Sequence, residues 1–414
     1  MKDMARAWIE VNLDAVAANY RAAVKLLRPG SRCMAVVKAD GYGLGAVQVA
    51  LVLQECGCQA FAVTSVEEGL VLREHGVKGI ILVLGPSMRT EWTAALSSGL
   101  QLSISDQTSV AELDALAGKL GVRAEIHIKL ETGMGRTGFP PTEMEKLASR
   151  LREAENLAVM GVYTHFARAA QRDRTYTERQ YKVFLDATAR LASAGVRPQW
   201  KHVCNSAAFL DFPDWHLDFV RLGTLLVGHL PGAGFHGRVT LRDPWAVKCR
   251  VLSVRRVAKG TCVGYQSTYR TGAETQLAVI PVGYADGFGL EPRLVPQGWV
   301  DLLKIIVKNL ALMFGVVLGR EKVSLCGRTV RVAGKIGMQL TILDVGLDEC
   351  RPGDEVCLPL RRTSANPRLL RLYLREGRIF AERRLKEGFS RVDQEYPMLR
   401  DDPAGMNGKA DTAD

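Results

Sequence analysis

The first half of the chain repeats two patterns of hydrophobic and polar positions in turn. Short apolar, β-branched runs indicate buried strands, and the segments between them have helical periodicity. The strand-like runs are Cys33–Lys38, Phe61–Ser65, Gly79–Leu84, Gln101–Ser105, Glu125–Glu131, Val159–Phe166, Trp200–Asn205 and Phe219–Val227. The helical segments include Ala46–Glu55, Val66–His75, Thr108–Leu120, Glu143–Glu153 and Arg174–Ala194. Eight strands that alternate with helices predict a TIM-like (β/α)₈ barrel. An open doubly wound sheet is the alternative, and the strand count favours the barrel.

The pattern changes after about residue 235 to short, alternating, valine-rich runs separated by glycine-containing turns. These runs are Val239–Ala258, Thr261–Tyr269, Gln276–Val282, Arg328–Val332 and Thr341–Val345. We therefore predict a barrel over residues 12–235 and a mostly β C-terminal domain over residues 236–386. The alternating segment at residues 6–11 is expected to add a strand to this second domain.

Two later segments fit neither pattern. Residues 301–322 are strongly apolar, with Lys304 and Lys308 on one helical face, and we expect an inserted helix packed on the β domain, where a subunit contact is a further place for its apolar face. The uncharged run at 309–319 has only eleven residues, too few to span a membrane. Residues 387–414 are polar and are expected to form a disordered tail.

The composition is that of a soluble globular protein, with 47% hydrophobic and 24% charged residues among 414. The N-terminus lacks the apolar segment of a signal peptide, which predicts a cytoplasmic protein with reduced cysteines. The net charge of +11 has no aromatic-interleaved basic stripe, so anionic small ligands are favoured over nucleic acid. The seven histidines are scattered and there is no C-x-x-C pair, so no metal is predicted.

A lysine ends the first buried run. Lys38 follows two valines at the end of the strand, and three glycines within residues 41–45 break the chain before the next helix. Removal of a lysine from water lowers its pKa, and the neutral amine can form a Schiff base with a carbonyl. A lysine that only extends its ammonium group into water at the barrel rim is the alternative.

Cationic or polar side chains end most of the later strands as well. They are Lys129, followed by Arg136, then His165, Asn205 with Ser206, and Arg221 with Gly223 and Thr224. The carboxyl ends of barrel strands converge on one mouth, so these groups predict an anionic ligand, with phosphate the natural candidate. Backbone N–H groups around Ser206, Gly223 and Thr224 could hold it. Each residue taken singly is better explained by ordinary capping or turn chemistry, but that explanation does not account for the whole set.

Short motifs in order along both domains accompany these residues. The lysine segment A-V-V-K-A-x-x-Y-G-x-G is joined by T-G-M-G-R, T-H-F-A, N-S-A-A, V-R-x-G, V-G-Y and V-G-Y-A-D-G. With them the chain resembles the alanine racemase family of pyridoxal-5′-phosphate (PLP) enzymes from about Trp8 to Gly346. The resemblance implies a head-to-tail homodimer with active sites at the subunit interface.

The resemblance also implies residue roles. Lys38 would hold PLP as a Schiff base and act as one catalytic base, and Tyr265 of the partner subunit would act on the opposite face. Racemisation needs two bases, because the proton leaves one face of the α-carbon and returns to the other. On the cofactor, the resemblance places Arg136 at the phenolic oxygen, Arg221 at the pyridine nitrogen and His165 along the ring, and the phosphate would be held by Tyr42, Ser206, Gly223 and Thr224. On the substrate, it places Arg136 and, at the carboxylate, Met338. Lys129 (carbamylated in some relatives) would support Arg136, and Tyr284 would line the entrance.

Three departures from the family pattern lie around the entrance. Gly43-Leu44-Gly45 replaces glycine-histidine-glycine, the segment 334–340 lacks an acidic residue after Met338, and no role is assigned to Arg375–Arg378, the nearest analogue of an R-V-P-R segment. The two bases are intact, so the reaction type is predicted more firmly than the substrate.

Several functions stay open at this stage. Alanine is the default substrate, and serine or another small amino acid is the near alternative. A barrel decarboxylase would need a catalytic cysteine motif in the β domain, which we do not identify, and a non-enzymatic PLP-binding protein would resemble the barrel alone. A role in wall synthesis and one in D-amino-acid catabolism are equally compatible with the sequence.

Overall fold

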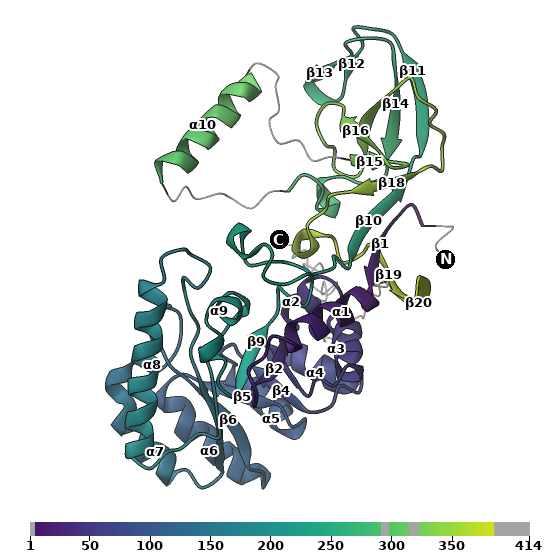
Figure 1. Cartoon of the computed structure of the whole chain (residues 1–414). Coiled ribbons are helices and arrows are strands. Elements are labelled where there is room, and N and C mark those ends of the chain that lie inside the picture. Colours follow the sequence, from purple (N-terminus) through teal and green to yellow (C-terminus); the bar gives the residue numbers. More distant parts are fainter. Residues whose placement is uncertain (1–4, 291–297, 314–322, 385–414) are drawn as a thin grey trace, which may run out of the picture.

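The structure is a computed structural model that describes residues 5–290, 298–313 and 323–384. The predicted tail at 387–414 and the end of the predicted insertion, at 314–322, lie outside the described residues. Figure 1 shows a barrel joined to a second, β-rich body, with one helix standing apart from both.

Eight parallel strands form the predicted barrel. They are β2 Arg32–Val36, β3 Ala60–Val63, β4 Ile80–Val83, β5 Gln101–Ile104, β6 Ala124–Lys129, β7 Leu157–Tyr163, β8 Trp200–His202 and β9 Phe219–Leu222, in the order β8-β7-β6-β5-β4-β3-β2-β9. The two end strands come together where the N–H of Arg221 donates to the carbonyl of Cys204 at 2.9 Å. The predicted fold class is confirmed. The last strand is shorter than predicted because the chain turns at Gly223, whose carbonyl accepts the N–H of Leu226 at 3.0 Å.

Helices surround the barrel as the periodicity predicts. They are α1 Leu13–Val24, α3 Ala46–Glu55, α4 Val66–Glu74, α5 Arg89–Ser97, α6 Gln107–Leu120, α7 Met144–Glu153, α8 Thr175–Ser193 and α9 Ser206–Asp211. The side chains of Asn12, Ser65 and Asp106 accept an N–H from the first turns of α1, α4 and α6. Such caps each contribute about 1 kcal/mol to helix stability.

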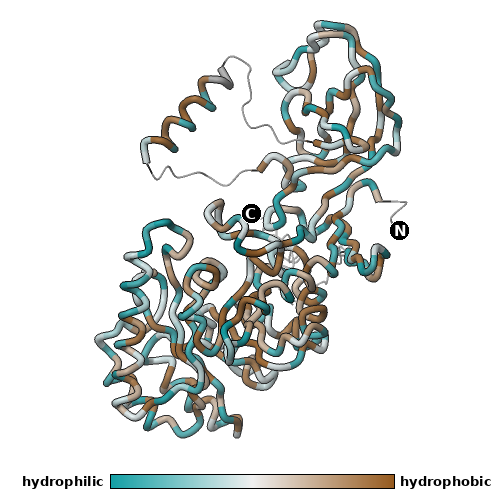
Figure 2. The backbone as a smooth tube through the Cα atoms, in the orientation of Figure 1, coloured by the Kyte–Doolittle hydropathy of each residue, from teal (hydrophilic) through white to brown (hydrophobic). Residues whose placement is uncertain are grey.

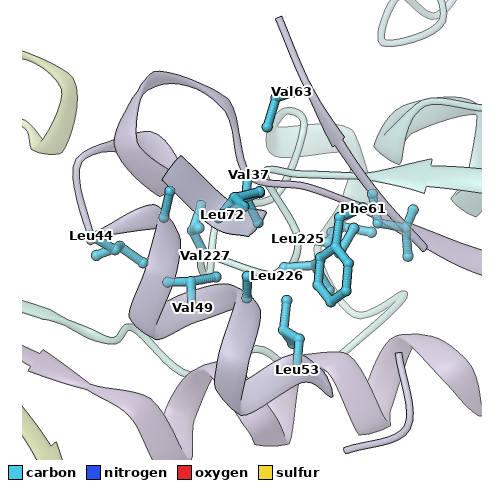
Figure 3. Close-up of a cluster of buried hydrophobic side chains, with 14 of the residues drawn as sticks. Val37, Leu44, Val49, Leu53, Phe61, Val63, Leu72, Leu225, Leu226 and Val227 are labelled. Atoms are coloured by element: carbon cyan, nitrogen blue, oxygen red, sulfur yellow. The ribbon is translucent and has the colours of Figure 1, made fainter. Parts of the chain in front are cut away.

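The core around the end of β2, the first strand of the barrel, is apolar. Val49 and Leu53 of α3 face Val37 and Phe61 in this cluster (Figure 3). A fully buried aliphatic or aromatic side chain of this size stabilises the fold by about 1.5–3 kcal/mol. This packing fixes the end of β2, from which Lys38 projects.

The β domain is one sheet of ten strands. Its strands are β1 Ala7–Asn12, β10 Trp245–Arg250, β11 Ser253–Val257, β14 Thr275–Ile280, β15 Val323–Leu325, β16 Arg328–Val332, β17 Thr341–Gly346, β18 Glu355–Leu358, β19 Leu370–Arg375 and β20 Arg378–Arg383. The N-terminal strand β1 lies between β10, to which it is antiparallel, and β19, to which it is parallel. A short ribbon, β12 Cys262–Val263 and β13 Tyr269–Arg270, projects from the domain. The predicted boundary at residue 235 stays a prediction.

Helix α10, Trp299–Met313, occupies the predicted insertion. It stands apart in Figure 1, and Figure 2 colours much of it as hydrophobic. Its large apolar side chains face outward, with Trp299 86% exposed, so the expected packing on the β domain is not what the structure shows. An apolar run indicates that a helix has a face to bury, but not where that face is buried. Among the described residues no helix combines the length and apolarity needed to cross a membrane.

Candidate active site

Lys38 leaves β2 into a strained turn, α2 Lys38–Tyr42. Residues 39–41 have φ values of 51°, 54° and 63°, a left-handed conformation that side chains with a Cβ rarely adopt. The turn is held from outside: Glu68 accepts the N–H of residue 39 at 2.6 Å, and the Asp40 carboxylate pairs with Arg383 of β20. The β domain therefore helps to fix the turn that carries Lys38.

The surroundings of Lys38 favour its neutral amine. Its side chain is half-buried, and burial lowers its pKa. The positive charge of Arg136 lowers the pKa further, and Glu68 only partly opposes this effect. Lys38 therefore releases its proton more readily than a lysine in water.

Lys129 is a second amine at the same mouth. It ends β6, is buried, and donates from Nζ to Thr137 Oγ1 at 2.5 Å. Burial, and then the charges of Arg136 and Arg221, lower the pKa of Lys129 to about 8. Arg136 therefore lies within electrostatic reach of both amines.

The loop that carries Arg136 is organised by Glu131, to which the sequence analysis assigned no role. The Glu131 carboxylate accepts four successive backbone N–H groups, those of residues 133–136, at 2.5–3.1 Å. Burial raises the pKa of Glu131, but these donors outweigh it and lower the pKa below its usual value. A carboxylate that opens a glycine-rich segment was the available sequence signal.

His165 lies among the same cations. Burial, followed by the charges of Arg221, Arg136, Lys38 and Lys129, lowers the pKa of His165 to about 3. Since all four cations affect this one imidazole, Lys38, Lys129, Arg136 and Arg221 lie around His165 at one mouth of the barrel. His165 itself is neutral at physiological pH.

Unfolding is expected to become easier as the pH falls below about 6. Burial lowers the pKa of His127 and His165 to about 3 and that of His202 well below its usual value. In the unfolded chain these side chains titrate near 6.5, so at pH values well below 6.5 and well above 3 the unfolded chain binds about three more protons. The free energy of unfolding should therefore decrease as the pH is lowered. The decrease is roughly 4 kcal/mol per pH unit where all three histidines are protonated in the unfolded chain only. Urea unfolding at pH 5, 6 and 7 measures the slope. His127→Gln should remove the contribution of one proton from the slope, about 1.4 kcal/mol per pH unit. An equal free energy of unfolding of the wild-type protein at pH 5 and 7 contradicts the prediction.

Arg221 is buried and nearly all its donors are used. Nη1 donates to Nδ1 and to the carbonyl of His202, both at 2.9 Å, and Nη2 donates to the carbonyls of Thr164 at 2.7 Å and Val203 at 3.1 Å. Among the described residues Nε–H has no acceptor, so one donor remains for a ligand. Burial lowers the pKa of Arg221 to about 10, which leaves it charged at neutral pH.

The residues predicted to hold a phosphate form a cradle. A Cβ on Gly223 would lie 2.2 Å from Tyr42 Oη, so only glycine allows this approach. The N–H of Gly223 also reaches Ser206 Oγ, at 3.4 Å. Burial raises the pKa of Tyr42 to about 12, so its hydroxyl stays a donor. Tyr42 and Thr224 both line a cavity of about 570 Å³ beside the β domain.

The three predicted β-domain residues lie elsewhere. Tyr265, in the 3₁₀ turn η5 Tyr265–Ser267, is 75% exposed, and Met338 is 59% exposed. Tyr284, in η6 Tyr284–Asp286, is joined to the Met338 segment where the N–H of Tyr284 donates to the carbonyl of Gly337 at 3.0 Å. No hydrogen bond within the described part of the chain joins these three side chains to the barrel mouth.

Sequence reasoning also missed the polar interior of the barrel. His127 and His202 were noted only as scattered histidines. Both are fully buried, they are hydrogen-bonded to each other, and His127 is also hydrogen-bonded to Gln101. Their signal was polar side chains at inward positions of barrel strands, such as residues 125, 127 and 129 of β6.

Fold and site together define a class: a (β/α)₈ protein with a second, β domain. At the carboxyl mouth of its barrel lie a lysine of lowered pKa and the close approach of Tyr42 and Ser206 to Gly223. Nine cysteines are free, and none of the described residues form a group suited to a metal ion.

Comparisons with known proteins identify the family. The alanine racemase N-terminal domain matches residues 11–231, and the alanine racemase C-terminal domain matches residues 245–370. An alanine racemase of Symbiobacterium thermophilum is 38% identical over 352 residues, 85% of this chain and 86% of the relative. The solved alanine racemase of Clostridium difficile 630 superposes with a TM-score of 0.82 at 27% identity, covering 92% of this chain and 99% of the other. A Bacillus anthracis alanine racemase structure with bound L-Ala-P gives a TM-score of 0.79 at 28% identity, covering 92% and 98%. This chain belongs to the alanine racemase family and is an isomerase of the racemase type.

Proposed function

We propose that this protein is a PLP-dependent racemase that interconverts L-alanine and D-alanine as a homodimer. The observation that carries the proposal is the convergence of Lys38, the uncommitted Nε–H of Arg221 and the Tyr42–Gly223 cradle on one mouth. The names of the relatives support alanine as the substrate.

The residues at the mouth fit PLP. The Tyr42 hydroxyl, Ser206 and the backbone of Gly223 would take the phosphate, with Thr224 beside them. Lys38 would bind the cofactor's carbonyl carbon, and His165 would line the ring. Arg221 would donate from Nε–H to the ring nitrogen without releasing a proton to it, because a guanidinium stays charged in proteins. When bound, PLP withdraws electrons from the substrate and acidifies its α-proton.

Lys38 and Tyr265 of the partner subunit would exchange the substrate's α-proton. Lys38 Nζ would take or return the proton on one face of the α-carbon, which its lowered pKa makes easier. The phenol Oη of Tyr265 would serve the opposite face. Arg136, supported by Lys129 and by the Glu131 loop, would bind the substrate carboxylate together with the Met338 backbone, and Tyr284 would line the entrance.

The exposure of the β-domain residues supports a shared site. Tyr265, Tyr284 and Met338 are solvent-exposed in one chain, and among the described residues no hydrogen bond joins their side chains to their own barrel mouth. Such a cluster of exposed apolar side chains is typical of an interface. A head-to-tail homodimer would bring this cluster to the mouth of the other subunit.

The proposed function is tested with the purified protein and L-alanine. Loss of circular dichroism of the amino acid is expected with added PLP, and D-alanine should give the mirror-image time course. L-serine assayed in parallel tests the near alternative. Carbon dioxide release from L-lysine or L-ornithine without loss of amino-acid chirality would support the decarboxylase, and the absence of both reactions would support a PLP-binding protein.

A further inference from the structure

A chain of hydrogen bonds crosses the barrel interior from Arg221 to the opposite mouth. Arg221 Nη1 contacts His202 Nδ1 at 2.9 Å, and His202 Nε2 contacts His127 Nδ1 at 2.9 Å. His127 Nε2 then contacts Gln101 Oε1 at 2.8 Å, and Gln101 Nε2 contacts the Glu125 carboxylate at 2.7 Å. The chain therefore joins a buried cation at the carboxyl mouth to an anion at the amino-terminal mouth.

The donor and acceptor in every link are determined by the chemistry of the two ends. Arginine has donors only, so His202 Nδ1 must accept. Burial keeps both histidines neutral, since it lowers the pKa of His127 to about 3 and that of His202 well below its usual value. A neutral imidazole that accepts at Nδ1 carries its proton on Nε2, so His202 donates to His127.

The same reasoning continues to the far end. His127 accepts at Nδ1, carries its proton on Nε2 and donates to Gln101 Oε1. The amide of Gln101 is thereby oriented with its NH₂ group toward Glu125, whose carboxylate accepts. All the hydrogen bonds are donated in one direction, and such aligned chains polarise and strengthen one another.

The surrounding side chains fit these rings closely. A Cβ on Gly161 of β7 would lie 2.2 Å from His127 Nδ1, so glycine leaves the space that the imidazole occupies. The ring of Tyr163 stacks on His202, with centroids 4.8 Å apart and planes 7° apart. Glu125 is exposed at the other end, where it and Gln101 line an open cavity of about 930 Å³.

We propose that Gln101, with Glu125 as its acceptor, is a positioning residue that acts through His127 and His202 to hold Arg221 with Nε–H free toward the ligand. Gln101 lies at the opposite end of the barrel from the carboxyl mouth and touches neither substrate nor cofactor. Its effect on turnover rests on the proposed function, whereas the direction of the chain does not.

The direction is measured first in the unloaded wild-type protein. With ¹⁵N-labelled imidazoles, NMR distinguishes the nitrogen that carries the proton from the one that accepts. Both His127 and His202 should carry the proton on Nε2 only. A proton on Nδ1 of either ring, or on both nitrogens, overturns the proposal, and no turnover is needed for this measurement.

Substitution at position 101 tests the positioning role. Gln101→Lys places a group with donors only against His127 Nε2, so the His127 proton should move to Nδ1 and oppose the Nε2–H of His202. The loss of one hydrogen bond in the chain to the charged Arg221 should lower kcat/KM roughly tenfold. Gln101→Glu keeps an acceptor toward His127 and should retain the wild-type tautomers.

The matched control is Gln107→Lys. Gln107 also donates to a glutamate, Glu143, at 3.0 Å, but outside the chain. This variant should leave the tautomers and kcat/KM unchanged. Unchanged tautomers in Gln101→Lys, or altered tautomers with wild-type kcat/KM, each overturn the proposal. Should Gln101→Lys fail to fold, the wild-type measurement and Gln101→Glu still decide the matter: loss of the Nε2–H tautomers in Gln101→Glu contradicts it.

Discussion

Replacing Lys38 with alanine is expected to lower racemase turnover by at least about 10⁴-fold, because in the proposed mechanism one side chain would supply both the covalent attachment and one proton-transferring base. No other amine of the mouth can replace it, since Lys129 Nζ is buried and bound to Thr137. Borohydride should fix PLP to the wild-type protein at residue 38 and should fix none to the Lys38→Ala variant. Mass spectrometry of the reduced, digested protein measures both results.

Lys78→Ala is the control for this experiment. Lys78 is an exposed barrel lysine that lines the cavity at the amino-terminal mouth. Its loss should change neither turnover nor covalent fixation. Fixation that persists in Lys38→Ala would show that a different lysine carries the cofactor, and the assignment of this mouth would be wrong.

Tyr265→Phe is expected to lower turnover by about 10²–10⁴-fold while the protein keeps its bound PLP and its visible absorption. The substitution removes only the phenolic oxygen, and no described hydrogen bond of the chain depends on that oxygen, so stability should not change. Tyr269→Phe is the matched control. The Tyr269 hydroxyl donates to Asp344 within the β domain, so its loss should affect stability more than turnover.

Mixing the two inactive variants tests whether the site is shared. In a heterodimer of Lys38→Ala with Tyr265→Phe, one mouth pairs an intact Lys38 with an intact Tyr265 from the other subunit. With random assortment, turnover should recover to about a quarter of the wild-type value. If each Tyr265 served its own barrel, unfolding and refolding the mixture would restore no activity.

The local pattern of the sequence was sufficient for the barrel. Most positions of the barrel strands are buried, and each intervening helix buries one face, so periodicity separates strands from helices. The grouping of the residues at the strand ends could also be predicted, because parallel strands of a barrel bring their carboxyl ends to one mouth. That is why Lys38, Lys129, His165 and Arg221 could be grouped before the structure was known.

The local sequence did not determine features that depend on partners far along the chain. The left-handed turn after Lys38 depends on Glu68 and on Arg383, which is more than three hundred residues away in sequence. The tautomers of His127 and His202 depend on which side chains of neighbouring strands face them. Helix α10 shows the same limit, since its apolar pattern predicted the helix but not its exposed position.

The sequence by itself determined the order of the elements, the barrel class and the residues that line one mouth, because burial and backbone periodicity act over a few residues. Only the tertiary structure decided which donors of Arg221 are already used, which lysine is tied to a threonine, and that Tyr265 lies exposed, away from the mouth of its own chain. Those properties come from hydrogen bonds and desolvation between side chains on different strands and domains, and no local pattern encodes such distances.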